Sequence, residues 1–262
     1  MRVFRIAVLL SALSVASIAH AQDLCADRPG KGSPSCVVDA GTLQIETSLV
    51  DWSRSDAGAT REDDLLFGDT LVKYGIGDDI ELHAAFTAYE HDRSRAPGAI
   101  DIASGVGDIA LGGRWRAIDG GDKGVSVALQ PMLTLPVGSK AVSQGTWSFE
   151  MIAPVDVPLS SAWSLNLSPT IAAAADQDGD GRHLAYGGSA GLSYQLTRQV
   201  TLGGEIWAQR DDDPAGHETQ VSADATLAWQ PGKNWQFDLS SYAGLTAATP
   251  DIELVAGMTR RF

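Results

Sequence analysis

The feature that most constrains this chain is a two-residue alternation of apolar and polar side chains that recurs from residue 43 to the end. In residues 200–210, Leu202 and Ile206 fall on one face, while Thr201 and Glu205 fall on the other. Successive side chains of a β-strand point to opposite faces, whereas a helix repeats every 3.6 residues or so. Because no ten-residue stretch beyond residue 40 carries an apolar stripe at helical spacing, the sequence predicts an all-β fold.

Twelve segments of this kind can be counted. They are residues 43–49, 68–75, 80–88, 105–117, 125–135, 147–157, 163–171, 184–196, 200–210, 220–229, 235–246 and 251–262. A water-soluble β-sandwich also alternates, but its apolar faces point inward and its strands are usually shorter. The pattern therefore favours an antiparallel transmembrane β-barrel of about 12 strands.

The connections between these segments alternate in length. Short ones lie at 77–78, 119–122, 159–161, 197–199 and 231–233, and longer ones at 53–63, 92–104, 137–145, 176–182, 211–216 and 247–250. Short periplasmic turns and longer outer loops are typical of bacterial transmembrane barrels. With an even strand count, both the N- and the C-terminus are expected on the periplasmic side.

Aromatic residues gather near the ends of the predicted strands, on the apolar faces. They are Trp115, Trp147, Trp163, Tyr194, Trp229, Trp235 and Phe262. Aromatic girdles at both membrane interfaces are expected of such barrels. The last segment ends on Phe262 and is interrupted on its apolar face by Arg260, whose long stem can reach the interface.

Residues 1–21 have the pattern of a cleaved secretory signal peptide: Arg2 and Arg5, a short apolar stretch, then Ala19-His20-Ala21. An N-terminal segment over 22–39 and a barrel over 40–262 follow. Without the signal, 17 basic residues face 33 acidic ones, a net charge of −16. This charge excludes a nucleic-acid partner.

Cys25 and Cys36, the only cysteines, lie eleven positions apart in the 22–39 segment. In the oxidising compartment to which the signal directs the chain, they are expected to form a disulfide. The closed segment would sit in the lumen as a plug or remain outside as a periplasmic cap, and the sequence does not choose between these positions. Our hypothesis is that it restricts the pore.

Gly105-Val106-Gly107-Asp108-Ile109-Ala110-Leu111-Gly112-Gly113-Arg114-Trp115-Arg116 resembles a strand of an outer-membrane family labelled the MetA pathway of phenol degradation. Asp27-Arg28-Pro29-Gly30 and Gly41-Thr42-Leu43-Gln44-Ile45-Glu46 are similar to members of that family that are described as transporters. The resemblance implies a channel for small, often aromatic or hydrophobic compounds in the outer membrane of a Gram-negative bacterium. A structural barrel without transport is an alternative.

If the apolar faces contact lipid, the opposite faces line a narrow, polar lumen. The lumen-lining candidates are Glu46, Lys73, Glu81, His83, Asp108, Arg114, Arg116, Glu150, Glu205, Asp224 and Asp238. Opposite charges on neighbouring strands can pair, so we expect most of them to satisfy one another. The expected partners are outer-membrane lipid and lipopolysaccharide, the barrel-assembly machinery through Phe262, and a small solute.

Three further motifs are weaker. Asp176-Gln177-Asp178-Gly179-Asp180 resembles half of a calcium loop but lacks its closing glutamate, so we expect a solvated acidic loop and no metal site or cofactor. Ser189 lies in a G-x-S-x-G pattern in mid-strand, where no nucleophile elbow forms. His91 and Ser94 match poorly the Ser–His pair of an outer-membrane phospholipase, the enzyme alternative. We therefore expect no enzyme.

Overall fold

The computed structural model describes residues 24–262; the predicted signal peptide lies outside this range. Its strands are β1 (Leu43–Ala57), β2 (Thr60–Gly75), β3 (Ile80–Ala96), β4 (Ala99–Gly105), β5 (Ile109–Ile118), β6 (Ser126–Leu135), β7 (Ser148–Ile152), β8 (Val155–Pro158), β9 (Trp163–Ala175), β10 (Arg182–Gln195), β11 (Val200–Asp213), β12 (Gly216–Gly232), β13 (Trp235–Gly244) and β14 (Ile252–Arg261). One short 3₁₀ turn spans Gly121–Lys123. Among residues 24–262, no helix is long and apolar enough to cross a membrane.

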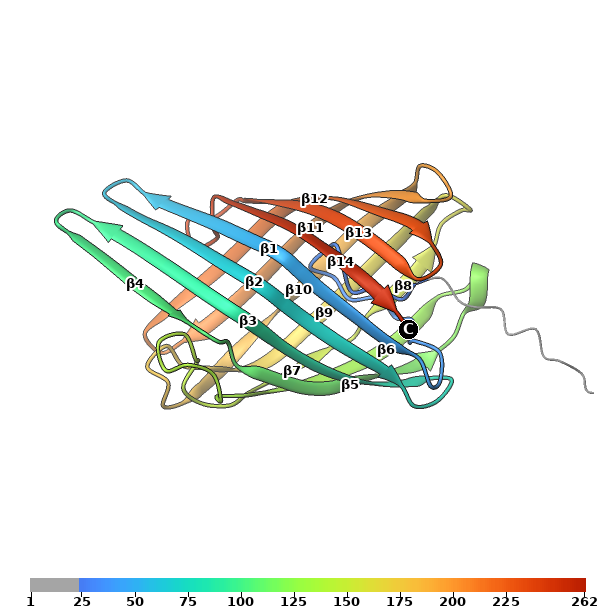
Figure 1. Cartoon of the computed structure of the whole chain (residues 1–262), viewed down its shortest axis with the longest axis horizontal. Coiled ribbons are helices and arrows are strands. Elements are labelled where there is room, and N and C mark those ends of the chain that lie inside the picture. The colour runs from blue at the N-terminus through green and yellow to red at the C-terminus, as the bar shows by residue number, and fades with distance from the viewer. Residues whose placement is uncertain (1–23) are drawn as a thin grey trace, which may run out of the picture.

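These strands form one closed, antiparallel barrel (Figure 1). β4 and β5 both pair with β3 and act as one interrupted strand, and β7 and β8 do the same between β6 and β9. β1 pairs with β14 and closes the ring. The prediction of a 12-strand all-β barrel is confirmed.

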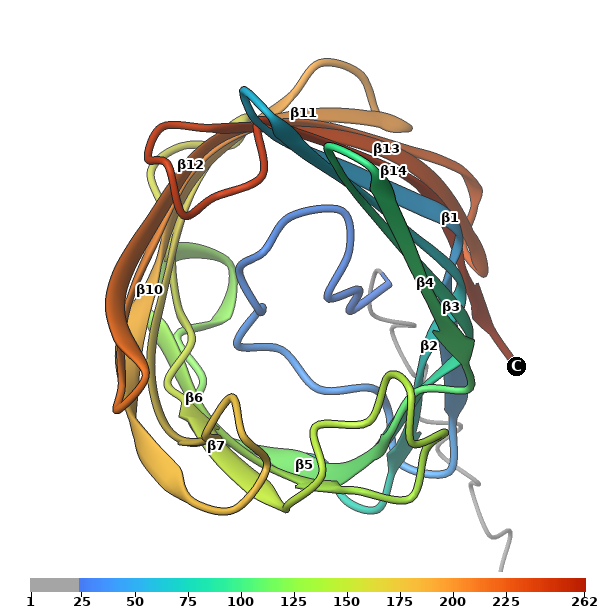
Figure 2. The ribbon, with the colours of Figure 1, turned by 90° about the vertical axis from the view of Figure 1, so that its left-hand side faces the viewer.

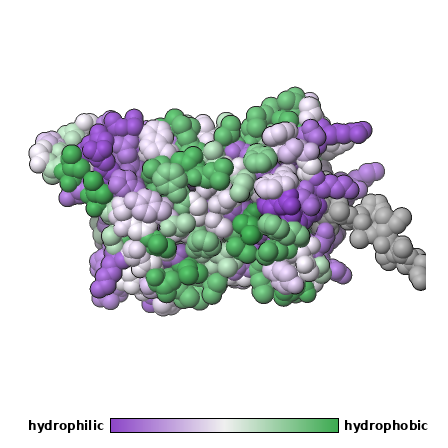
Figure 3. All heavy atoms as spheres, viewed as in Figure 1, coloured by the Kyte–Doolittle hydropathy of each residue, from purple (hydrophilic) through white to green (hydrophobic). Residues whose placement is uncertain are grey.

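The outer surface carries a broad apolar belt (Figure 3). Large apolar side chains such as Leu82, Leu111, Ile171 and Leu239 are each about half exposed. Burying this much apolar surface in lipid avoids the cost of leaving it in water. Arg260 lies on this outer face over the rings of Trp235 and Phe262, at 4.3 and 5.3 Å from their centroids, which accounts for a charge on the final strand.

The two ends of the barrel differ. At one end, which we call the short-turn end, tight turns join β2 to β3, β8 to β9 and β10 to β11, and the C-terminus lies there (Figure 1). At the other, the hairpin end, β1–β2 and β3–β4 project beyond the ring (Figure 1). Whether the short-turn end faces the periplasm stays a prediction.

Three of the six longer connections were predicted wrongly as loops. The strands continue through 53–63, 92–104 and 211–216 and leave two-residue turns at 58–59, 97–98 and 214–215. Gly58 and Gly98 have φ of 71° and 83°, the left-handed conformation that such turns require. In most of these extensions both faces carry polar residues, so the alternation that marks a strand is lost; the exception is β4, where Ile100 and Ile102 alternate with Asp101.

The side chains of three neighbouring strands change face at one level of the barrel. In β1, Gln44 and Ser48 are buried inside, Leu49 is 51% exposed outside, and Asp51 again points inward. The register between β1 and β14 shifts at this point, as a β-bulge requires. β2 changes face at Gly68, whose φ is 64°, and β3 changes face beside it at Ala88.

Candidate functional site

The N-terminal segment, residues 24–39, lies inside the barrel (Figure 2). We call this segment the plug. Cys25 and Cys36 form a disulfide across it, and the bridge of Ala40 to Gly75 marks where the chain leaves the lumen to begin the wall. The sequence left open whether this segment lies in the lumen or outside it as a periplasmic cap. In the structure it lies in the lumen.

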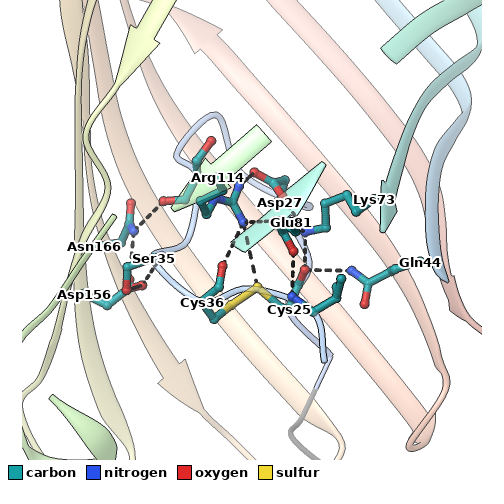
Figure 4. Close-up of a disulfide and its surroundings, with 12 residues drawn as sticks. Cys25, Asp27, Ser35, Cys36, Gln44, Lys73, Glu81, Arg114, Asp156 and Asn166 are labelled. Carbon is teal, nitrogen blue, oxygen red and sulfur yellow. Dashed lines mark hydrogen bonds and ion pairs between the residues drawn. A yellow bond between two sulfur atoms is a disulfide. The ribbon is translucent and has the colours of Figure 1, made fainter. Parts of the chain in front are cut away.

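Two buried basic side chains of the wall hold the disulfide end of the plug (Figure 4). Lys73 in β2 lies 2.7 Å from Asp27 and 2.9 Å from Glu46, and donates to the Cys25 carbonyl. Arg114 in β5 pairs with Asp27, lies 3.1 Å from Glu81 and donates to the Cys36 carbonyl at 3.0 Å. Since Lys73 and Arg114 are at most 1% exposed, each depends on these partners for its charge.

Asp27 is the plug carboxylate that both basic side chains share. Burial alone would raise its pKa, but the adjacent Arg114 and Lys73 outweigh burial and hold the pKa of Asp27 well below its ordinary value. The carboxylate is therefore ionised at neutral pH and pairs with the two cations.

Arg28 of the plug spans the seam at which the barrel closes. Its guanidinium lies 2.9 Å from Asp238 in β13 and donates to Ser48 in β1 at 2.7 Å, across the intervening β14. A Cβ at Gly257 of β14 would lie 2.2 Å from the guanidinium. Glycine at this position therefore makes room for the arginine.

On the opposite side of the lumen, side chains of the wall accept hydrogen bonds from backbone N–H groups of the plug. Asp156 in β8 accepts from Ser35 N at 2.6 Å, and Glu205 in β11 accepts from Lys31 N and Gly32 N at 2.8 and 3.1 Å. A Cβ at Gly32 would lie 2.6 Å from Asn166 Oδ1. The plug is thus tied to strands all round the ring, and its close approach to β9 requires glycine.

Towards the hairpin end, the lumen is open. A cavity of about 930 Å³ has Asp27, Arg28 and Lys31 of the plug at its base and Glu150 among its walls. On the β9–β12 side of the plug, a smaller cavity of about 180 Å³ is lined by Arg28, Gly30, Glu205 and others. Both cavities reach Arg28 and Gly30, so the plug separates two hollow regions of one lumen.

One wall of the open half is lined with carboxylates. We call these residues the acidic wall: Asp51, Glu62, Asp64, Glu90, Asp92 and Glu253. Asp64 and Asp92 stand directly opposite each other on β2 and β3. Glu253 pairs with Lys31 at 3.0 Å, the one ion pair that an acidic-wall carboxylate makes within residues 24–262. Like charges directly opposite are destabilising, so this wall is not built for stability.

The predicted lumen residues fall into distinct places. Glu46, Lys73, Glu81, Arg114, Glu205 and Asp238 contact the plug. His83 bonds Glu81 at 2.7 Å, and the buried Asp224 pairs in register with Glu205.

Asp108 and Arg116, on the same strand face as Arg114, lie further towards the ends. Asp108 accepts from Gly138 N and Gln144 N and so fixes the loop between β6 and β7. Arg116 pairs with Asp79 and Asp119 at the short-turn end.

Sequence reasoning missed most of the acidic wall. Asp51, Asp64, Glu90 and Asp92 were not among the candidates, because they fall outside the predicted strands 43–49, 68–75 and 80–88. Extending those strands with a strict two-residue period would also put them on the outer face. The change of face at Leu49, Gly68 and Ala88 brings them in. The available signal was Gly68 in the interior of a strand, which often marks a bulge.

The acidic loop predicted at 176–180 is held by a histidine. His183 in β10 lies 2.9 Å from Asp176 and 2.7 Å from Asp211, and Asp213 is 3.5 Å away. Asp176, His183 and Asp213 are close enough together to share a cation. The ion pairs that already join them close the loop onto β11.

The motifs that suggested catalysis remain apart. Ser189 lies in the middle of β10, as predicted, with its hydroxyl beside the plug near Gly32. His91 and Ser94 point to opposite faces of β3, and His91 Nδ1 instead lies 2.7 Å from Ser104 Oγ in β4. Within residues 24–262, no carboxylate bonds the other ring nitrogen of His91.

The known structures that are similar to this chain include the following three barrels. The COG4313 outer membrane channel from Pseudomonas putida F1 has a TM-score of 0.68 and 17% identity, covering 90% of this chain and 99% of that one. The β-domain of the Bordetella autotransporter BrkA has a TM-score of 0.53 and 13% identity over 86% and 100%. The NanC porin has a TM-score of 0.51 and 8% identity over 83% and 98%.

These neighbours share the fold of this chain. Together with the apolar belt, they place the barrel in the outer membrane of a Gram-negative bacterium. No curated protein matches the sequence. The family described as "Putative MetA-pathway of phenol degradation" matches residues 26–262, nearly the whole described chain. The protein therefore belongs to this family of outer-membrane β-barrels.

Proposed function

We propose that the protein is a passive, non-enzymatic channel for small molecules, and that the plug is its constriction. The observation that carries this proposal is the cavity of about 930 Å³, which opens towards the hairpin end and is floored by the plug. A structural barrel has no need of such a hollow, because barrels of small diameter are filled by side chains. The similarity to an outer membrane channel supports the same function.

The acidic wall suggests which solutes pass. It lines a separate cavity of about 400 Å³, and its largely unpaired carboxylates attract cations and repel anions, since a low-dielectric surround strengthens the field of charges in a cleft. The family label names phenol degradation, and a phenol is uncharged at neutral pH because its hydroxyl titrates near pH 10, like that of tyrosine. We therefore propose small neutral or cationic compounds, aromatic ones included, as the solutes.

Planar-bilayer recording tests both parts of this proposal. We expect the purified protein to give small, discrete conductance steps and, under a KCl gradient, a reversal potential of the sign that cation selectivity requires. Phenol is expected to interrupt the current more strongly than benzoate at equal concentration. Absence of conductance would refute the channel, and stronger interruption by benzoate would refute the solute class.

Removing residues 24–38 tests the constriction separately. The plug is tied to the wall by ion pairs that its removal leaves unpaired, so folding of the truncated barrel must be checked by circular dichroism. We expect a several-fold larger unit conductance in the folded protein. An unchanged conductance would show that the plug does not restrict the pore.

A lipid-hydrolysing barrel is the second candidate, favoured by the Ser104–His91 contact on the outer face. The pair lacks the third group that orients the base in a catalytic triad within residues 24–262. Phospholipid hydrolysis by purified protein, lost in Ser104→Ala and kept in Ser94→Ala, would establish it. We expect no hydrolysis from either variant or from the unmodified protein.

A further inference from the structure

Four arginines gather on the outside of the barrel near the hairpin end, where the chain elsewhere is strongly acidic. We call Arg54, Arg61, Arg93 and Arg95 the outer arginine cluster. They come from β1, β2 and β3 and surround Asp63, and a second carboxylate, Asp56, lies directly opposite Arg61 at the edge of the cluster. Residues 22–262 have 12 arginines in all and a net charge of −16, so a third of these arginines lie at one point on the surface.

Asp63 does not neutralise this cluster. Its oxygens lie 2.8 Å from Arg54 Nε, 3.0 Å from Arg61 Nε and 3.9 Å from Arg95. With Asp56, which lies opposite Arg61, two negative charges face four positive ones, and the side chains of Arg54, Arg61 and Arg95 remain about one third exposed.

Two of the arginines also lie in an unfavourable arrangement. Arg61 and Arg95 are directly opposite each other on β2 and β3, a like-charge pair that destabilises a sheet. The Nε atoms of Arg93 and Arg95 are shielded from solvent and have no hydrogen-bond partner within residues 24–262. A bound anion would relieve both conditions, because an oxyanion accepts hydrogen bonds from several guanidinium groups at once.

The surroundings of the cluster are apolar. Directly below it, Phe67 and Tyr89 are each more than 40% exposed, and their ring centroids are 6.5 Å apart. Trp52 beside them lies under Arg54, at 4.6 Å. On the flank, Ile100 and Ile102 of β4 are opposite Arg95 and Arg93 and about 60% exposed. In Figure 3, a hydrophilic patch interrupts the apolar surface near the left-hand end.

We propose that the outer arginine cluster binds the phosphate groups of the glycolipid in the outer leaflet, with its acyl chains along the aromatic and isoleucine side chains. The positive charge of the cluster complements the headgroup phosphates, and the adjacent apolar side chains would contact the acyl chains. A soluble anion would use only the first of these features. The assignment also puts the hairpin end on the outside of the cell, which agrees with periplasmic termini.

Binding of bisphosphoryl lipid A to the purified, detergent-solubilised protein tests this site, with native mass spectrometry as the readout. The test variant is R93Q/R95Q. The matched control is R182Q/R210Q, which removes two arginines from β10 and β11 at the same end of the barrel. We expect the test variant to lose about tenfold or more in affinity, at least 1.4 kcal/mol, and the control to bind as the unmodified protein does.

Two further measurements distinguish the source of the phosphate. Dephosphorylated lipid A is expected to bind weakly to all forms, and orthophosphate at equal concentration is expected not to displace the lipid. Equal binding of bisphosphoryl lipid A by R93Q/R95Q and the control, with native circular dichroism, would overturn the site. Displacement by orthophosphate would overturn the assignment to a lipid.

Discussion

The two halves of the lumen use charge in opposite ways. Around the plug, basic and acidic groups alternate and touch: Lys73 and Arg114 each contact two or more carboxylates and are almost fully buried. Towards the hairpin end, carboxylates stand beside carboxylates, as at Asp64 and Asp92, which line a cavity of about 400 Å³. Carboxylates are therefore paired with buried cations in one half and stand largely unpaired in the other.

The difference shows what each half can tolerate. A buried charge that loses its partner costs about 3–5 kcal/mol, so the plug half depends on every member of its network. A solvated like-charge pair costs far less to keep and acts on ions at a distance. We accordingly expect mutations in the plug half to change how much current passes, and mutations in the open half to change which ions carry it.

The largest effect is expected from Arg114→Ala. This change removes one of the two basic partners of Asp27 and the nearer basic partner of Glu81, and it removes the hydrogen bond to the Cys36 carbonyl. The plug should leave its seat, with a several-fold increase in single-channel conductance. Arg116→Ala is the control: it lies two residues further along β5 and pairs with the half-exposed Asp79 and Asp119. Equal conductance of the two variants would contradict the seal.

An intermediate effect is expected when the plug disulfide is removed in Cys25→Ser/Cys36→Ser. A disulfide closing a loop of this size is worth about 2–4 kcal/mol, mainly by restricting the undocked chain. The contacts of Lys73 and Arg114 with backbone carbonyls remain, so the plug should leave only transiently. The recording should show brief openings above the basal level, and dithiothreitol should produce them in the unmodified protein. A steady current in both cases would show that the disulfide does not hold the plug.

A change in selectivity without a change in conductance is expected from Asp64→Asn/Asp92→Asn. Neutralising this opposed pair reduces the field of the acidic wall and leaves the plug untouched. The reversal potential under a KCl gradient should move towards zero. Asp101→Asn/Asp122→Asn, at two exposed positions outside the cavity, should leave it unchanged. A shift of equal size in both variants would assign selectivity to net charge and not to this wall.

The smallest effect is expected from pH. Because the pKa of Asp27 is lowered in the docked plug, its contribution to docking is complete above the undocked value of about 4 and is lost as the pH falls through the docked one. Hydrogen exchange of the plug amides, corrected for intrinsic rates, should stay constant from about pH 8 to 5 and increase only in stronger acid. Asp27→Asn should show the faster exchange already at neutral pH. A plug that loosens between pH 8 and 5 would point to a different group.

The barrel could be predicted from the sequence because lipid requires strict alternation. Leu82 and Leu239 lie on the outer, lipid-facing surface, and every second residue of such a strand must be apolar, which is visible in the sequence. Beyond the membrane the requirement ends, so the extensions of β1 to β4 read as loops. The change of face at Leu49, Gly68 and Ala88 was hidden for another reason: a bulge adds one residue and shifts every later side chain to the other face.

The plug could be predicted as a segment but not as an occupant of the lumen. Its contacts join residues as distant as Arg28 and Asp238, 210 positions apart. The spacing of neighbouring residues in the sequence cannot predict contacts over such distances. The oppositely charged candidates were correctly expected on the inner faces of neighbouring strands, but the plug carboxylate that Lys73 and Arg114 share was not foreseen.

The arginine across the seam has a consequence for biogenesis. Arg28 needs Ser48 from the first strand and Asp238 from the penultimate one, and Gly257 of the last strand lies beneath it. This binding site does not exist until the two ends of the sheet have met. The plug can therefore take up this position only after the first and last strands have paired, so its docking is the last step in the assembly of the fold.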